Sequence, residues 1–182
     1  MVNLIGSVKS ELEEVRDGVY SYILSVQREN GVVDDFEVRT TRRKNVQVGA
    51  IVEIIGEVRV IKEDGGRSYF VMEKNRRTAK NRSEHFNTVM ISGNLIADPK
   101  CVGSKSKDNE IVRFTINKER AYAKLNQTDY ITCFAWHPYV QYVESKKEGD
   151  KLHVIGRLQT QEYTNADGET RRIFEITTAY VF

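Results

Sequence analysis

The sequence predicts an all-β protein made of two similar halves, and two observations support this. Most of the chain consists of short runs in which apolar and polar residues alternate, separated by glycine, asparagine and aspartate turns, as is typical of half-buried strands. The pattern G-x-x-[VL]-x-[IV]-I-G-x-[VL] begins at Gly49 and again at Gly149, a spacing of 100 residues. In a chain of 182 residues, such a repeat indicates two small domains of one kind.

The repeat extends beyond this pattern. NLIGSV at 3–8 corresponds to NTVMISGNL at 87–95, and both halves have an acidic, glycine-containing turn about 100 residues apart. Gly56 and Gly156 interrupt equivalent apolar runs. Because a residue without a Cβ tolerates a bulge, we expect these two glycines to mark the point where a strand of a small barrel bends.

The second half has the layout of an OB fold. It contains expected strands near 87–96, 110–120, 128–136, 151–163 and 171–181. The segment between the third and fourth strands has helical character: Pro138 suits a first turn, Val140 and Val143 share a face, and Gly149 could end the helix. Five strands with a helix between the third and fourth is the OB arrangement. The first half repeats the strands, but 42–49 leaves no room for a full helix.

We therefore expect two tandem OB-type five-stranded barrels, a reduced one at 1–73 and a complete one at 86–182, joined by a basic linker at 74–85. Five basic residues and no acid lie between 74 and 82: Lys74, Arg76, Arg77, Lys80 and Arg82. Such a run suits a solvated linker or a segment that follows phosphates, and the two roles are compatible.

Composition limits the function classes. The net charge of +2, from 28 basic and 26 acidic residues, does not by itself predict a nucleic-acid partner. No apolar run approaches the roughly 18 residues that cross a bilayer, so no membrane partner is expected. The N-terminus meets charged residues too early for a signal peptide. Cys101 and Cys133 lie far apart, which favours the reducing cytoplasm and argues against a disulfide framework or a thiolate metal site. No cofactor is expected.

Two aromatic residues of the expected third strand in the second half share a face. Tyr130 and Trp136 have the same parity, whereas Ile131, Cys133 and Ala135 have the opposite parity and suit a barrel interior. Because every base has a π-face, an exposed aromatic side chain stacks on any base, at about 1–3 kcal/mol per base. This pattern favours single-stranded nucleic-acid binding without sequence preference.

Four stretches of the second half carry a family resemblance: NTVMISGNLIADPK at 87–100, VRFTINKERAY at 112–122, the long run at 128–168 and RRIFEITT at 171–178. Over residues 86–181 the chain resembles the bacterial single-stranded DNA-binding protein family. The first half resembles it only through the repeat. The tandem arrangement is similar to that of two-barrel members of this family and of two-barrel primosomal replication proteins.

The resemblance implies that four aromatic residues stack on bases: Tyr122, Tyr130, Trp136 and Tyr163. Phe114 and Phe134, in contrast, are expected to fill the core. Basic residues flank the aromatic positions and are expected to contact phosphates: Arg113, Lys118, Arg120, Lys124, Arg157, Arg171 and Arg172. Singly, each suits an ordinary surface charge, but together they form the groove that non-specific single-strand binders use.

The first half departs from this pattern. The repeat places Phe36 opposite Tyr130 and Arg42 opposite Trp136, and only one of the four stacking positions stays aromatic. The first domain is therefore expected to serve assembly or to contact phosphates through a basic group: Arg39, Arg42, Arg43 and Lys44.

The resemblance also implies partners. Relatives arrange four barrels around DNA, so two chains of this protein would complete the set, and a homodimer is expected. Ile131 stands where the family usually has a histidine that helps assembly. The contacts between barrels are therefore expected to differ from those of the family. The sequence ends at TTAYVF without the family's acidic tail, so recruitment of partners through such a tail is not expected. The expected role is in DNA replication, recombination or repair.

Other function classes have less support. The sequence has no P-loop, GxSxG or HExxH motif, and His85, His137 and His153 are isolated, so an enzyme is not expected. The alternative is a primosomal-type assembly protein that uses OB barrels to hold protein partners and binds DNA secondarily. An RNA ligand also stays open, because stacking does not distinguish the 2′-hydroxyl group.

Overall fold

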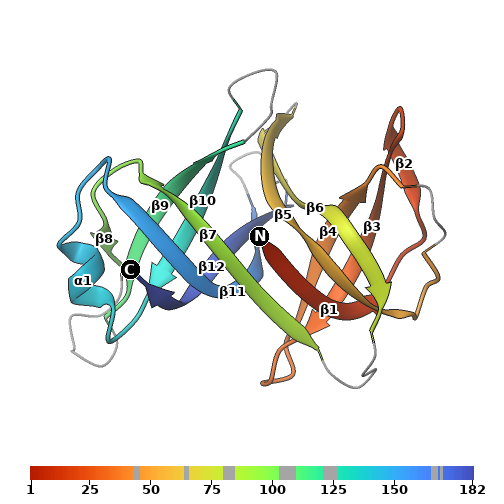
Figure 1. Cartoon of the computed structure of the whole chain (residues 1–182), viewed down its shortest axis with the longest axis horizontal. Coiled ribbons are helices and arrows are strands. Elements are labelled where there is room, and N and C mark those ends of the chain that lie inside the picture. The colour runs from red at the N-terminus through yellow and green to blue at the C-terminus, as the bar shows by residue number, and fades with distance from the viewer. Residues whose placement is uncertain are drawn as a thin grey trace. The chain divides into compact units, whose positions relative to one another are not determined.

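Strands make up nearly all of the regular structure in the computed structural model (Figure 1). The structure describes the chain except for residues 43–45, 64–65, 80–84, 103–109, 121–126, 165–167 and 169, and except for the side chains at 63, 66, 163 and 171. It divides into two compact units. Unit 1 contains Met1–Thr88 and Glu162–Ile173, and unit 2 contains Val89–Gln161 and Phe174–Phe182.

Five of the first six strands form a closed circuit of pairings in unit 1. The six are β1 (Val2–Val8), β2 (Glu13–Arg16), β3 (Val19–Gln27), β4 (Val33–Thr40), β5 (Ile51–Glu63) and β6 (Gly66–Thr78). β2 pairs with β3 outside the circuit. β1 pairs antiparallel with both β3 and β5, β3 pairs with β4, β4 runs parallel to β6, and β6 pairs with β5. Inward-facing apolar side chains fill the space that the circuit encloses, among them Leu4, Leu24, Phe36, Ile54 and Val71.

The second half repeats this order. Its elements are β7 (Phe86–Leu95), β8 (Lys100–Cys101), β9 (Val112–Glu119), β10 (Thr128–Ala135), α1 (Val140–Glu144), β11 (Lys151–Thr164) and β12 (Thr170–Val181). β7 pairs with β9 and β11, β9 pairs with β10, β10 runs parallel to β12, and β12 pairs with β11. The strands that were expected in this half are all present, with ends within two residues of the predicted ones, whereas the short strands β2 and β8 were not predicted.

The helix is shorter than its sequence pattern suggests. α1 has five residues, and Val140 and Val143 are buried on one face as expected. Pro138 lies in the turn before α1, joined to His137 by a cis peptide bond, so it is not in the first helical turn. Gly149 does not cap the helix; it lies in the following turn with φ of 89°, and its N–H donates to the Leu95 carbonyl.

The predicted linker at 74–85 requires a correction. Its first five residues belong to β6, where Arg76 lies opposite Ile54 and Arg77 opposite Glu53. Arg77 Nε donates to Glu53 Oε2 at 2.6 Å, and this bond holds the pKa of Glu53 below its usual value. The start of the basic run is therefore part of a paired strand and not of a linker.

The repeated glycines allow backbones to approach closely. A Cβ on Gly56 would lie 2.6 Å from the Met72 carbonyl oxygen, and one on Gly156 would lie 2.1 Å from that of Thr177. In β5 the register also shifts between Ile55 and Gly56, which is the bulge expected at this position. The two glycines are thus equivalent in structure as well as in sequence.

A second pair of glycines fixes the register of the repeat. A Cβ on Gly6 would lie 2.3 Å from the carbonyl oxygen of Ser25 on β3, and one on Gly93 would lie 1.9 Å from that of Asn117 on β9. Ser25 and Asn117 therefore occupy equivalent positions in the two halves.

Candidate nucleic-acid interface

The outward face of β10 carries a row of aromatic side chains. Burial alternates along the strand: Ile131 and Cys133 are fully buried, whereas Tyr130 is 37% exposed. Trp136 follows the strand and is half-buried. The observed alternation agrees with the shared face that parity predicted for Tyr130 and Trp136.

Phe134 belongs to this row, which corrects the expectation that it fills the core. It is half-buried rather than buried, and its ring centroid lies 6.2 Å from that of Trp136 with the ring planes at 46°. The position could have been found from the sequence, because Phe134 has the same parity as Tyr130 and Trp136. Phe114 is buried, as expected.

Polar and basic side chains of β9 lie beside the row. Arg113 is opposite Phe134, Thr115 is opposite Thr132, and Asn117 is opposite Tyr130. Arg113 is exposed and Lys118 is half-buried; no ion pair of either is present among the described residues. Arg113 has the parity of the outward face, whereas Lys118 is the cross-strand partner of the buried Asp129 and has the opposite parity. Phosphate contact stays a prediction for both.

On the side of β10 away from β9, the neighbouring strand β12 contributes a buried carboxyl group. Glu175 of β12 lies opposite Thr132 and is only 7% exposed. Burial raises the pKa of Glu175, while the positive charge of Arg113 and a hydrogen bond from Gln159 oppose this shift. On β11, the half-buried Arg157 has a buried Nε that lacks a hydrogen-bond partner within the described part of the chain. The phosphate contact of Arg157 therefore stays a prediction.

Arg120 has a different role from the predicted one. Its Nε and Nη2 donate to the two oxygens of Asp129 at 3.0 and 2.7 Å, and its Nη1 donates to Gln127 Oε1 at 2.5 Å. The Asp129 side chain is completely buried, and that of Arg120 is 13% exposed. Because this buried carboxylate neutralises the guanidinium, we remove Arg120 from the phosphate-contact group.

Several other residues predicted to contact DNA either lie outside the described part of the chain or form hydrogen bonds with neighbouring residues. Residues Tyr122, Lys124 and Arg43 lie outside the described part of the chain, as do the side chains of Tyr163 and Arg171. Arg172, within unit 1, donates to Glu162 Oε1 at 2.8 Å and to the Asp35 carbonyl oxygen at 3.2 Å. It is exposed, so this pair leaves it accessible.

In unit 1, the prediction that Phe36 stacks on bases is wrong. Ser25 lies opposite Asp35, as its counterpart Asn117 lies opposite Tyr130, so Asp35 and not Phe36 takes the position of Tyr130. Phe36 has no exposed surface and belongs to the core. The error is a one-residue slip, and in a strand such a slip moves a side chain to the opposite face.

The unit 1 face is occupied by charge pairs. Lys9 Nζ lies 2.5 Å from Asp35, and Arg39 Nε donates to Glu37 at 2.5 Å while its guanidinium lies over the Phe70 ring at 4.1 Å. Arg39 is also buried, so it does not offer the free charge that was expected of it. Arg42 is exposed after β4 and remains a candidate.

One group of described side chains has the composition of a metal site. The ligand atoms of Cys101, Glu110 and Glu144 lie within 4.8 Å of one another. Cys101 and Glu144 are exposed, and exposed acidic side chains often gather without an ion. We assign no metal site to this group.

Comparison with known proteins identifies the family. The model of the single-strand binding protein family matches residues 86–181, more than half of the chain. The chain belongs to the single-strand binding protein family. Proteins of this family are non-enzymatic, in agreement with the sequence-based expectation.

Curated relatives match about half of the chain. The single-stranded DNA-binding protein of Thermus aquaticus is 30% identical over 87 residues, which are 47% of this chain and 33% of the relative. That of Enterococcus faecalis is 29% identical over 94 residues, which are 50% of each chain. The matched region thus spans half or less of these relatives.

The likeness in structure covers the whole chain. The crystal structure of the wild-type single-stranded DNA-binding protein from Thermus aquaticus has a TM-score of 0.76 at 20% identity and covers 100% of this chain and 90% of its own. A deletion mutant of that protein gives 0.77 at 19% identity, with 100% and 92% covered. This member of the single-strand binding protein family therefore has a nearly all-β, OB-like fold. Among its described residues, no helix is long and apolar enough to span a membrane.

Proposed function

We propose that the protein binds single-stranded DNA without sequence preference, and that bases stack on the outward face of β10. We further propose that each closed circuit of strands is an OB-type barrel. The observation that carries the proposal is the outward row formed by Tyr130 and Phe134 on β10 and by Trp136 directly after it. Exposed apolar side chains that gather on one face are typical of interaction surfaces, and these three offer π-faces to any base.

Basic side chains around the row would neutralise the phosphates. Arg113 lies on one side of β10 beside Phe134, and Arg157 on β11 brings an unsatisfied Nε. The sequence-based prediction adds Lys118, which lies opposite Asp129 at the other end of β9. Hydrogen bonds between charged groups are the stronger class, so contacts of these side chains with phosphate oxygens would add to the affinity. The resemblance adds Tyr122, Tyr163, Lys124 and Arg171 as further contacts.

The finer parts of the proposal follow the family. We place the protein in DNA replication, recombination or repair in the cytoplasm, acting as a homodimer. The relatives named single-stranded DNA-binding proteins favour this function over the alternative of a primosomal-type assembly protein.

A matched pair of tyrosine variants tests the proposal. Tyr130 and Tyr142 are 37% and 38% exposed, but Tyr142 lies on α1 and not on the aromatic row. Tyr130→Ala is expected to weaken oligothymidine binding about 5- to 150-fold, the equivalent of one lost stack of about 1–3 kcal/mol. Tyr142→Ala is expected to leave affinity unchanged, and duplex DNA of equal length is expected to bind far more weakly to the parent. Equal affinity of the parent for duplex and single strand would contradict the proposal.

A further inference from the structure

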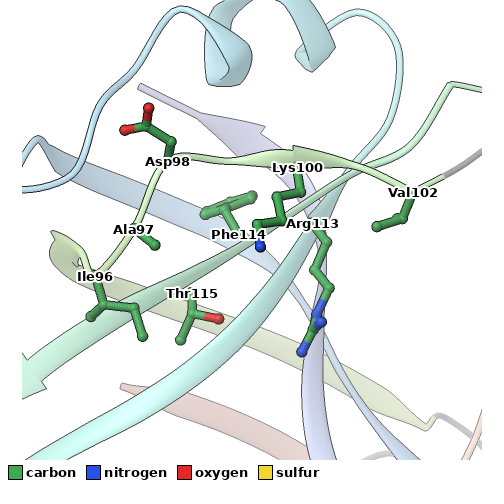
Figure 2. Close-up of a pocket in the computed structure, with 8 residues that line it drawn as sticks. All are labelled: Ile96, Ala97, Asp98, Lys100, Val102, Arg113, Phe114 and Thr115. Carbon is green, nitrogen blue, oxygen red and sulfur yellow. The ribbon is translucent and has the colours of Figure 1, made fainter.

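A hollow lies on unit 2 on the far side of β9 from β10. It has a volume of about 170 Å³ and is lined by residues 96–98 after β7, by Lys100 and Val102 at β8, and by residues 113–115 of β9 (Figure 2). Ile96 and Val102 are 40% and 53% exposed, which leaves apolar surface open to a ligand. Of the residues that line this hollow, only Arg113 was predicted from the sequence to contact nucleic acid.

The charge of the hollow is positive. Asp98, its one acid, accepts a hydrogen bond from the Glu148 N–H at 2.9 Å and one from Lys147 Nζ at 3.2 Å. These bonds hold the pKa of Asp98 below its usual value, and the Asp98 carboxylate points away from Lys100 and Arg113 in Figure 2. Neither of these two cations forms an ion pair with any residue that the structure describes. An anionic ligand is therefore favoured.

The hollow lies next to the aromatic row, because two residues of β9 border both. Arg113 and Thr115 line it, and the same two residues lie directly opposite Phe134 and Thr132 on β10. Adjacent strands are about 4.8 Å apart, so one strand separates the hollow from the row. A DNA strand that leaves the row across β9 would pass over Arg113 and enter the hollow.

We propose that the hollow is a subsite for one further nucleotide of the bound strand. Its base would lie against Ile96 and Val102, and its phosphate would contact Lys100 and Arg113. The volume is below the roughly 300–1,000 Å³ of sites that enclose a drug-sized ligand, so it suits the base alone, with the phosphate at the mouth of the hollow. This inference rests on the proposed DNA-binding function and adds Lys100 to the residues that serve it.

Two variants of the full chain test the subsite with oligothymidines of increasing length. Lys100→Glu reverses a charge, and Ile96→Asp places a carboxylate where the base would lie; both side chains are already exposed, so folding should be retained. We expect each to lower the affinity for long oligomers about tenfold. For Lys100→Glu, the slope of log affinity against log salt should also fall by about 0.7, the value for one phosphate on a single strand.

Lys62→Glu is the control, since Lys62 is an exposed strand lysine in unit 1 and its reversal changes the net charge equally. Parent-like binding by both hollow variants would overturn the subsite and leave the proposed function intact. An equal loss in Lys62→Glu and Lys100→Glu would also overturn it, because the effect would then be one of net charge. A parent protein that does not bind oligothymidine at all would show that the proposed function itself fails.

Discussion

Arg120 holds the fully buried carboxylate of Asp129 in a bidentate pair, one residue before the exposed Tyr130. The same relationship occurs in unit 1, where Arg28 Nε and Nη2 donate to Asp34 at 2.7 and 2.6 Å. In both cases the pair joins the end of one strand to the start of the next. The pair therefore fixes the backbone at the point where the aromatic row begins.

Asp129→Ala is expected to destabilise the protein strongly. Removing one partner of a buried ion pair leaves an uncompensated charge, which typically costs about 3–5 kcal/mol of the free energy of unfolding. Urea unfolding of parent and variant measures this. Arg77→Ala, which breaks an exposed pair with Glu53, is the control and is expected to cost far less. A double variant, Arg120→Met with Asp129→Leu, should recover most of the loss, and failure of Asp129→Ala to exceed the control would contradict this role.

Glu175 makes stability depend on pH in an unusual direction. Burial raises the pKa of Glu175 in the folded state, so folding favours the protonated carboxyl group. The free energy of unfolding therefore falls as the pH rises from below the ordinary pKa of 4.5 through the higher pKa of the folded state. Glu175→Gln is therefore expected to be more stable than the parent at neutral pH. Urea unfolding between pH 4 and 8 should show this difference shrinking as pH falls. A difference that grows as pH falls would contradict the burial of this carboxyl group.

Gly156→Ala is expected to destabilise unit 2. The new Cβ would lie 2.1 Å from the Thr177 carbonyl oxygen, a backbone atom that cannot move aside without shifting β12. Overpacking of this kind typically costs about 1–3 kcal/mol. Gly31→Ala is the control: its φ of 85° imposes backbone strain but its surroundings are open, so thermal unfolding should separate steric overlap from strain. A Gly156→Ala variant as stable as the parent would show that the two backbones are not so closely packed.

The sequence predicted the strands of the second half and the equivalence of Gly56 and Gly156, because period-two burial and close backbone approach both depend on local residue type. It failed where a tertiary contact decided the outcome. Arg120 has the composition of a phosphate contact, and only the buried Asp129 shows that its charge is already neutralised. Phe36 was misplaced because the loops before it differ in length between the halves, and the register is fixed by the glycine contacts instead. Lys100 could not be predicted, since its role depends on which strands border the hollow.

The central claim is base stacking on the β10 row, and the fluorescence of Trp136 tests it most directly. Trp136 is the only tryptophan in the chain, so no label is needed. Titration with poly-thymidine is expected to quench its emission strongly, and Trp136→Ala is expected to remain folded while losing about 1–3 kcal/mol of binding free energy. Unquenched emission in the parent, together with unchanged affinity in a folded Trp136→Ala variant, would contradict the account.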